Sequence, residues 1–158
     1  MAEDLLIDKS LSKEQQYQQL IPQIEGLLMG ETNVIANLGN VASALKYAFE
    51  FLWVGFYLVE GSELVLGPFQ GPPACTRIKK GKGVCGTSWE TMQTLVVADV
   101  DAFPGHIACS SLSRSEIVIP IIRNNTVTMV LDVDSQHLNN FNETDKIYLE
   151  KICSLIQI

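Results

Sequence analysis

The sequence predicts an α+β domain in which an antiparallel sheet has helices packed on one face and long loops over the other. Helical hydrophobic periodicity occurs near both ends of the chain, and two pairs of apolar runs joined by short turns lie between them. Runs that are paired in hairpins form an antiparallel sheet. With 158 residues and no internal repeat or linker, the chain is expected to form a single domain over 1–158.

Two helices are expected first. Ser12 and Gln15 form a capping box, in which each side chain accepts from the other residue's backbone N–H, and apolar residues follow at helical spacing over 12–29. A second helix is expected over 33–50, with Thr32 as its N-cap.

Period-two patterns begin after the second helix. Residues 52–59 and 63–69 form a predicted hairpin around Glu-Gly-Ser, and Gly-Pro-Pro at 71–73 ends it. A short strand is expected at 77–78. The cysteine that lies between the hairpin and this strand, Cys75, is therefore placed in a loop.

The middle of the chain combines short elements with a long loop. Residues 83–92 predict a short helix with Cys85 in its first turn, and 95–98 predict a strand. Residues 101–113 have no sustained period and are expected to form a loop. Long loops inside compact domains are usually functional.

A second hairpin and a last helix complete the domain. The hairpin is expected over 116–122 and 126–133, and Asn142 is expected to cap the helix. The inward side of that helix includes Ile147 and Cys153, and Cys153 is interpreted as a core residue.

Composition excludes several classes of protein. A hydrophobic content of 47%, a charged content of 18% and a net charge of −7 fit a compact acidic protein and disfavour nucleic acid as a partner. No run approaches the roughly 18 apolar residues of a membrane span. We expect a cytoplasmic protein whose cysteines are reduced at rest.

Three cysteines in or beside loops indicate redox chemistry or a metal site. Cys109 lies three residues after His106, which can lower a thiol pKa, and Cys85 begins a helix, whose dipole favours a thiolate. Cys109 can instead be a buried structural thiol, and Gly83 and Gly86 beside Cys85 can serve turn geometry instead of a reactive thiol. Zinc bound by Cys75, Cys85, Cys109 and His106 is weakly indicated because there is no close cysteine pair, so no metal is expected.

Acids and aromatic residues complete the candidate site. Glu116 begins one strand of the second hairpin, and Asp132 and Asp134 share a face at the end of the other, so the three carboxylates are expected to converge. The alternative is that they are solvated strand ends. Trp53 and Tyr57 share one face of the first strand, which allows them to form a pocket wall.

Several segments carry a resemblance to a known family: WVGFY at 53–57, LGPFQG at 66–71, AC at 74–75, GKGVCG at 81–86, FPGHIAC at 103–109, SEIV at 115–118 and LDVDS at 131–135. They resemble the free methionine-(R)-sulfoxide reductases, which are single-domain enzymes of the GAF fold. The resemblance runs from about residue 15 to the end of the chain and includes all three loop cysteines.

The resemblance implies reduction of free L-methionine (R)-sulfoxide to methionine, with thioredoxin as the reductant, a homodimeric assembly and no cofactor. By position, Cys109 is similar to the nucleophilic cysteine and Cys75 to the cysteine that resolves its sulfenic acid. Cys85 is similar to a third thiol that can take part in exchange.

The substrate residues follow from the same resemblance. Trp53 resembles the wall that receives the methyl group, and Glu116, Asp132 and Asp134 resemble the acids around the substrate. Tyr57 is a candidate for the same pocket because it shares a strand face with Trp53. A sulfoxide oxygen leaves poorly unless it is protonated, and desolvated carboxylates such as Glu116 or Asp134 can supply that proton. The alternative functions are a GAF-type sensory module without catalysis and a zinc-binding interaction protein.

Overall fold

The computed structural model describes residues 4–107 and 109–157, and it has the expected α+β architecture. Its elements follow in the predicted order: α1 Lys13–Leu28, α2 Val34–Phe49, β1 Trp53–Glu60, β2 Glu63–Gln70, β3 Arg77–Lys79, α3 Gly83–Thr91, β4 Leu95–Val97, a 3₁₀ turn at Val100–Ala102, β5 Ser115–Arg123, β6 Thr126–Ser135 and α4 Glu143–Leu155.

One antiparallel sheet of six strands forms the centre of the described part of the chain, in the order β3-β2-β1-β6-β5-β4. The two predicted hairpins, β1–β2 and β5–β6, are adjacent in this order. They meet where β1 pairs with β6, so residues 53–58 lie opposite residues 129–134. The centre of the sheet therefore brings the aromatic strand next to the acidic strand.

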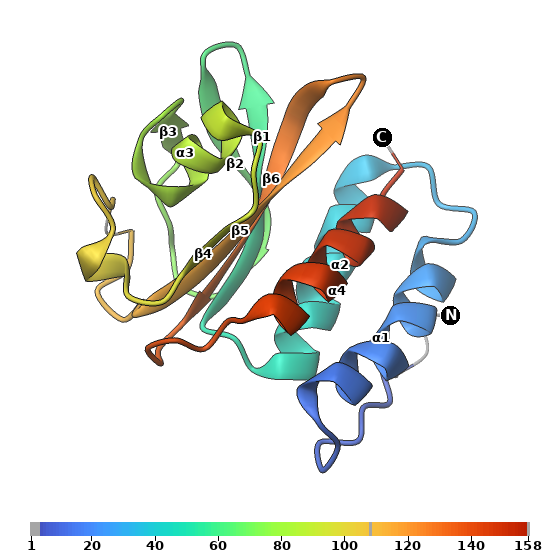
Figure 1. Cartoon of the computed structure of the whole chain (residues 1–158). Coiled ribbons are helices and arrows are strands. Elements are labelled where there is room, and N and C mark those ends of the chain that lie inside the picture. The colour runs from blue at the N-terminus through green and yellow to red at the C-terminus, as the bar shows by residue number, and fades with distance from the viewer. Residues whose placement is uncertain (1–3, 108, 158) are drawn as a thin grey trace.

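Helices α2 and α4 cover one face of the sheet, and α1 packs on the outside of both (Figure 1). The capping box of Ser12 and Gln15 is confirmed at the start of α1, and Asn142 caps α4 as predicted. The predicted cap of α2 was wrong: Asn33 takes this place, and its side chain accepts from the Ala36 N–H. Adjacent Thr and Asn are both good caps, so sequence alone did not decide between them.

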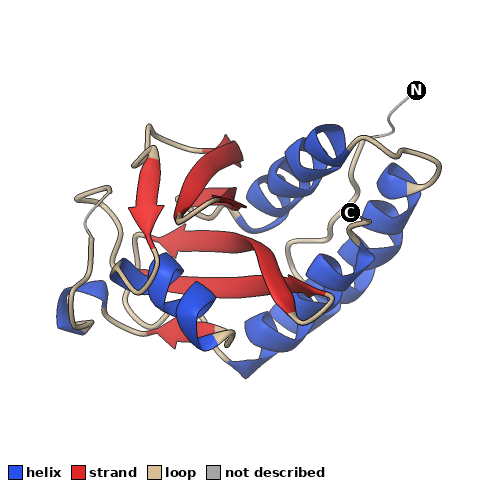
Figure 2. Cartoon of the chain, turned by 90° about the horizontal axis from the view of Figure 1, so that it is seen from above, coloured by secondary structure: helices blue, strands red, loops and turns tan. Residues whose placement is uncertain are grey.

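The opposite face carries α3 and the long loops (Figure 2). The prediction that helices occupy one face therefore holds for α1, α2 and α4, while α3 lies on the loop face. A Cβ at Gly86 would overlap the Lys79 carbonyl oxygen, and Gly83 has a φ of +60°. These two glycines serve the turn and the close packing of α3 on β3, one of the two roles considered for them.

Alternation along the strands divides the interior into two clusters. Val54 and Phe56 of β1 face the helices, and Trp53 and Tyr57 face the loops. On α4, Cys153 is buried in the helix-side cluster as predicted, whereas Ile147 is exposed, contrary to the expectation. The loop-side face is the one that holds the candidate site.

Gly55 gives the first testable prediction. A Cβ there would overlap the Trp53 ring and the Phe69 Cβ. We expect Gly55→Ala to lower the free energy of unfolding by about 1–3 kcal/mol, because the overpacked ring must move. The control is Gly39→Ala in α2, where a Cβ meets no atom within 4 Å, and it should stabilise by about 0.5–1 kcal/mol. Urea unfolding measures both, and equal changes would contradict the prediction.

The described residues include no helix that is both long enough and apolar enough to cross a membrane.

Candidate active site

A disulfide joins the two loops that lie over the open face of the sheet. Cys75, between β2 and β3, is bonded to Cys109, between the 3₁₀ turn and β5, with the Cα atoms 5.4 Å apart. The two cysteines are 34 residues apart in the sequence. Their loops meet only because strands from opposite halves of the sheet bring them together.

Strand β1 positions the loop that carries Cys75. The Trp53 Nε1–H donates to the Pro72 carbonyl oxygen at 3.1 Å, and the Tyr57 hydroxyl donates to the Cys75 carbonyl oxygen at 2.9 Å. The two rings stack with centroids 5.9 Å apart. Because both side chains are buried, they form a fixed aromatic wall below the disulfide.

The three predicted acids converge on one face, as expected from the hairpin. Glu116 on β5 is the register partner of Asp134 on β6, and Asp132 lies two residues before Asp134. All three line one pocket with Trp53 and Tyr57. Glu116 and Asp132 are not the solvated strand ends of the alternative interpretation, since they are only 6% and 7% exposed, whereas Asp134 is partly exposed.

Burial raises the pKa of all three acids. Desolvation raises the pKa of Glu116 and of Asp132 well above their usual values. Nearby negative charge adds to this effect: Asp132 raises the pKa of Glu116 further, and Asp134 raises that of Asp132. Desolvation also raises the pKa of Asp134 to about 6. The site therefore contains carboxyl groups that hold a proton at a pH where ordinary acids have lost it.

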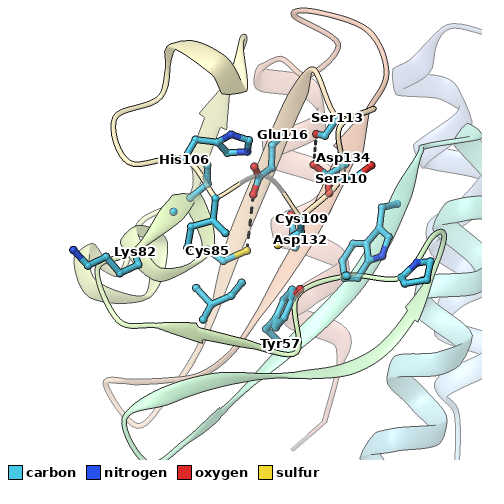
Figure 3. A pocket seen from close by; sticks show the side chains of 17 residues that line it. Tyr57, Lys82, Cys85, His106, Cys109, Ser110, Ser113, Glu116, Asp132 and Asp134 are labelled. Atoms are coloured by element: carbon cyan, nitrogen blue, oxygen red, sulfur yellow. Dashed lines mark hydrogen bonds between the residues drawn. The ribbon is translucent and has the colours of Figure 1, made fainter.

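Ser113 is a site residue that sequence analysis missed. Its hydroxyl donates to the Asp134 carboxylate (Figure 3), and this bond lowers the Asp134 pKa against the effect of burial. Ser113 lies in the aperiodic loop before β5. No spacing or motif marked it, because its partner is set by the loop path and not by the chain order.

The environment of the Cys85 thiol differs from the one predicted. The thiol is buried in α3, and its Sγ donates to the Glu116 carboxylate at 3.9 Å (Figure 3). Burial raises its pKa well above the usual value, and the neighbouring acids Asp132 and Glu116, when ionised, raise it further. The expectation that the helix dipole favours a thiolate was therefore wrong, since desolvation and two acids outweigh the dipole.

One small cavity connects these groups. It has a volume of about 40 Å³, and His106, Cys109 and Cys85 line it together with the acids and the aromatic wall (Figure 3). The zinc set considered from the sequence is not assembled in this state, because Cys75 and Cys109 are bonded to each other. Cys153 lies in the other cluster, away from the site.

The raised pKa of Asp134 predicts how stability depends on pH. Its pKa is about 6 in the folded protein against an ordinary value of 3.8, so the folded state binds more protons between these values. Stability therefore falls as pH rises from about 4 to about 6, and the loss persists above pH 6. We expect Asp134→Asn to raise the melting temperature by a few degrees at pH 7.5 and not at pH 3.5.

Asp101→Asn, at an exposed position in the 3₁₀ turn Val100–Ala102, is the control for this experiment. Thermal unfolding of both variants at the two pH values provides the measurement. A gain of the same size at both pH values for Asp134→Asn would contradict the electrostatic explanation.

Comparison with known proteins identifies the family to which the chain belongs. The sequence profile of the GAF domain matches residues 35–158. The chain is 63% identical to GAF domain-containing protein A of Dictyostelium discoideum, over 99% of both chains. It is 43% identical to the free methionine-R-sulfoxide reductase of Saccharomyces cerevisiae, over 98% of this chain and 91% of that protein.

A solved structure leads to the same family as these sequence matches. The free methionine-R-sulfoxide reductase of Neisseria meningitidis, in complex with its substrate, superposes with a TM-score of 0.95 at 51% identity, over 99% of this chain and 93% of that one. The likeness covers every element of the fold and both loops that carry the disulfide. This chain therefore belongs to the free methionine-R-sulfoxide reductases, a family built on the GAF domain.

Proposed function

We propose that this protein reduces free L-methionine (R)-sulfoxide to L-methionine through its own thiols. The observation that carries the proposal is the Cys75–Cys109 pair next to a pocket lined by buried acids. A pocket that only binds a ligand needs neither a cysteine pair between two distant loops nor carboxyl groups that retain protons. Reduction of a sulfoxide requires both features, since the cysteine pair supplies two electrons and the carboxyl groups supply a proton.

In the first step, the reduced Cys109 attacks the sulfur of the substrate. The sulfoxide oxygen is transferred to the cysteine sulfur, while a carboxyl group, Glu116 or Asp134, protonates that oxygen. The substrate sulfur gains two electrons and becomes the thioether of methionine. The cysteine sulfur loses two and becomes a sulfenic acid.

In the second step, the Cys75 thiol attacks the Cys109 sulfenic acid. The S–O bond of the sulfenic acid breaks, a disulfide forms, and the oxygen leaves as water, so the two sulfurs together remain oxidised by two electrons. Support for this pairing comes from the bond between the same two residues in the structure. A dithiol reductant, which we propose is thioredoxin, then opens the disulfide by exchange.

The remaining groups of the pocket hold the substrate. We assign Asp132, together with whichever of Glu116 and Asp134 does not donate the proton, to the substrate ammonium group. Trp53 and Tyr57 form the apolar wall for the methyl group, since their rings are stacked and buried below the loops. This arrangement favours the free amino acid, because a peptide-bound residue has no ammonium group to offer.

Further parts of the proposal concern the whole protein. We propose that residues 1–158 form a single GAF-like domain, that two copies form a homodimer and that the protein works in the cytoplasm. Sedimentation of the purified protein tests the dimer. Cys85 is proposed as a further thiol for exchange, although its burial and raised pKa make it a slow one.

Single-turnover reduction tests the function. The pre-reduced protein, without thioredoxin, is mixed with free methionine (R)-sulfoxide, and methionine and free thiols are counted. We expect about one methionine formed and about two thiols lost per chain, as one sulfenic acid and one disulfide require. The (S) form should not react. Addition of thioredoxin, its reductase and NADPH should convert the single turnover into a steady rate.

No methionine and no thiol loss, in folded and metal-free protein, would overturn the reductase proposal. Binding of the sulfoxide without its reduction would then favour the sensory module.

A further inference from the structure

Three groups at the bottom of the pocket form a compact set of metal-ligand types. The Cys85 thiol from α3, the Glu116 carboxyl from β5 and the Asp132 carboxyl from β6 each offer one ligand atom, and these atoms lie within 4.8 Å of one another. All three residues are buried. Figure 3 shows the Cys85 sulfur and the Glu116 carboxyl facing each other across the pocket.

Asp132 supplies an independent indication of a missing partner. Its Oδ1 is buried and has no hydrogen-bond partner among the described residues. A buried carboxylate oxygen without a partner is costly, and such atoms in native proteins usually meet a water, an ion or a ligand. This oxygen belongs to a residue that is 7% exposed and lines the same pocket.

We propose that Cys85, Glu116 and Asp132 form a binding site for a thiophilic divalent cation such as Zn²⁺. The sulfur ligand selects this class, because Mg²⁺ and Ca²⁺ prefer oxygen ligands alone. The two carboxyl groups release their protons when the ion binds, and the charge of the ion then stabilises the two carboxylates side by side. The thiol loses its proton as the metal–sulfur bond forms.

The spacing of the groups agrees with this proposal. Tetrahedral zinc ligands, with Zn–S of about 2.3 Å and Zn–O of about 2.1 Å, stand roughly 3.6 Å apart. The Cys85 Sγ and the Glu116 Oε1 are 3.9 Å apart, so small side-chain rotations suffice. A water molecule can complete the tetrahedral set as the fourth ligand.

This set differs from the zinc ligands considered from the sequence. That set needed Cys75 and Cys109, which are bonded to each other here. The present set uses the one pocket thiol that the disulfide leaves free, and two acids that are distant from it in sequence. It can therefore be occupied while the disulfide is intact.

Metal binding would also compete with substrate binding, a consequence that rests on the proposed function. Glu116 and Asp132 cannot hold both the ion and the substrate. We expect free methionine (R)-sulfoxide or methionine to lower the apparent affinity for the ion. The metal site itself does not depend on this, since it is measured without substrate.

The test uses the disulfide form of the full-length protein and Cd²⁺, whose bond to a thiolate has an ultraviolet charge-transfer band. In this form the free thiols among the described residues are Cys85 and Cys153. We expect the band to saturate at about one Cd²⁺ per chain and to be reversed by a chelator. Cys153→Ala, which removes the other buried thiol, should keep the band, and Cys85→Ser should lose it.

Asp132→Asn tests the site without removing the thiol. Loss of even an outer-shell partner of a metal ligand costs about tenfold or more in affinity, so this variant should bind Cd²⁺ at least that much more weakly. Circular dichroism checks that each variant is folded. Absence of the band in the wild type, its retention in Cys85→Ser, or unchanged affinity in Asp132→Asn would each overturn the proposal.

Discussion

Cys109→Ser should lower the turnover of free methionine (R)-sulfoxide by at least about a thousandfold, as expected when the nucleophile of a covalent mechanism is removed. The proposed reaction transfers the sulfoxide oxygen to this sulfur, and a hydroxyl cannot accept it. Single turnover with pre-reduced protein measures the effect directly, because no recycling step contributes. Cys153→Ala is the matched control, since it removes a buried thiol in the helix-side cluster and should leave the rate unchanged.

The same experiment separates the roles of the other two thiols. Cys75→Ser should still form about one methionine per chain, because attack on sulfur does not need the resolving cysteine. It should then stop with a sulfenic acid that traps with dimedone. Continued turnover of Cys75→Ser with thioredoxin, together with its loss in Cys85→Ser, would exchange the two assignments. Full turnover of Cys109→Ser would remove the mechanism altogether.

The framework of the fold was predictable because its signals are local. The capping box at Ser12, the cap at Asn142 and the two hairpins each rest on residues within a few positions of one another. The hairpin pairing also predicted that Glu116 lies opposite the acidic end of the next strand, and the register with Asp134 confirms it. The exact partner was not predictable, because the turn alone would place Glu116 opposite Val133. An irregularity between Ile121 and Ile122 shifts the register by one residue and places Glu116 opposite Asp134.

The environment of the site was not predictable, because it depends on contacts between distant segments. The sequence places Cys85 at a helix start but gives no sign that Glu116 and Asp132 pack against it. These contacts raise the pKa that the helix dipole alone would lower. The bond from Ser113 to Asp134 and the position of α3 on the loop face depend in the same way on the path of the loops.

Glu116→Gln is the second variant with a large expected effect, and it identifies the proton donor. Asp134 has a pKa of about 6, so it is mostly ionised at neutral pH and suits the substrate ammonium group. Burial and Asp132 raise the Glu116 pKa well above its usual value, so Glu116 retains a proton to give. We expect Glu116→Gln to lower the single-turnover rate by about 10²- to 10⁴-fold, the usual contribution of general acid catalysis.

The pH profile of the reduction rate also distinguishes the two acids, because each predicts a different profile. A donor must begin protonated, so its rate falls as pH rises through its pKa. If Glu116 donates, the wild-type rate at saturating substrate does not fall near pH 6, and Asp134→Asn weakens substrate binding while it leaves this rate largely intact. A rate that falls above pH 6 and is lost in Asp134→Asn, but persists in Glu116→Gln, would make Asp134 the donor. Glu116 would then hold the ammonium group, so the two carboxyl groups would exchange tasks within the same pocket.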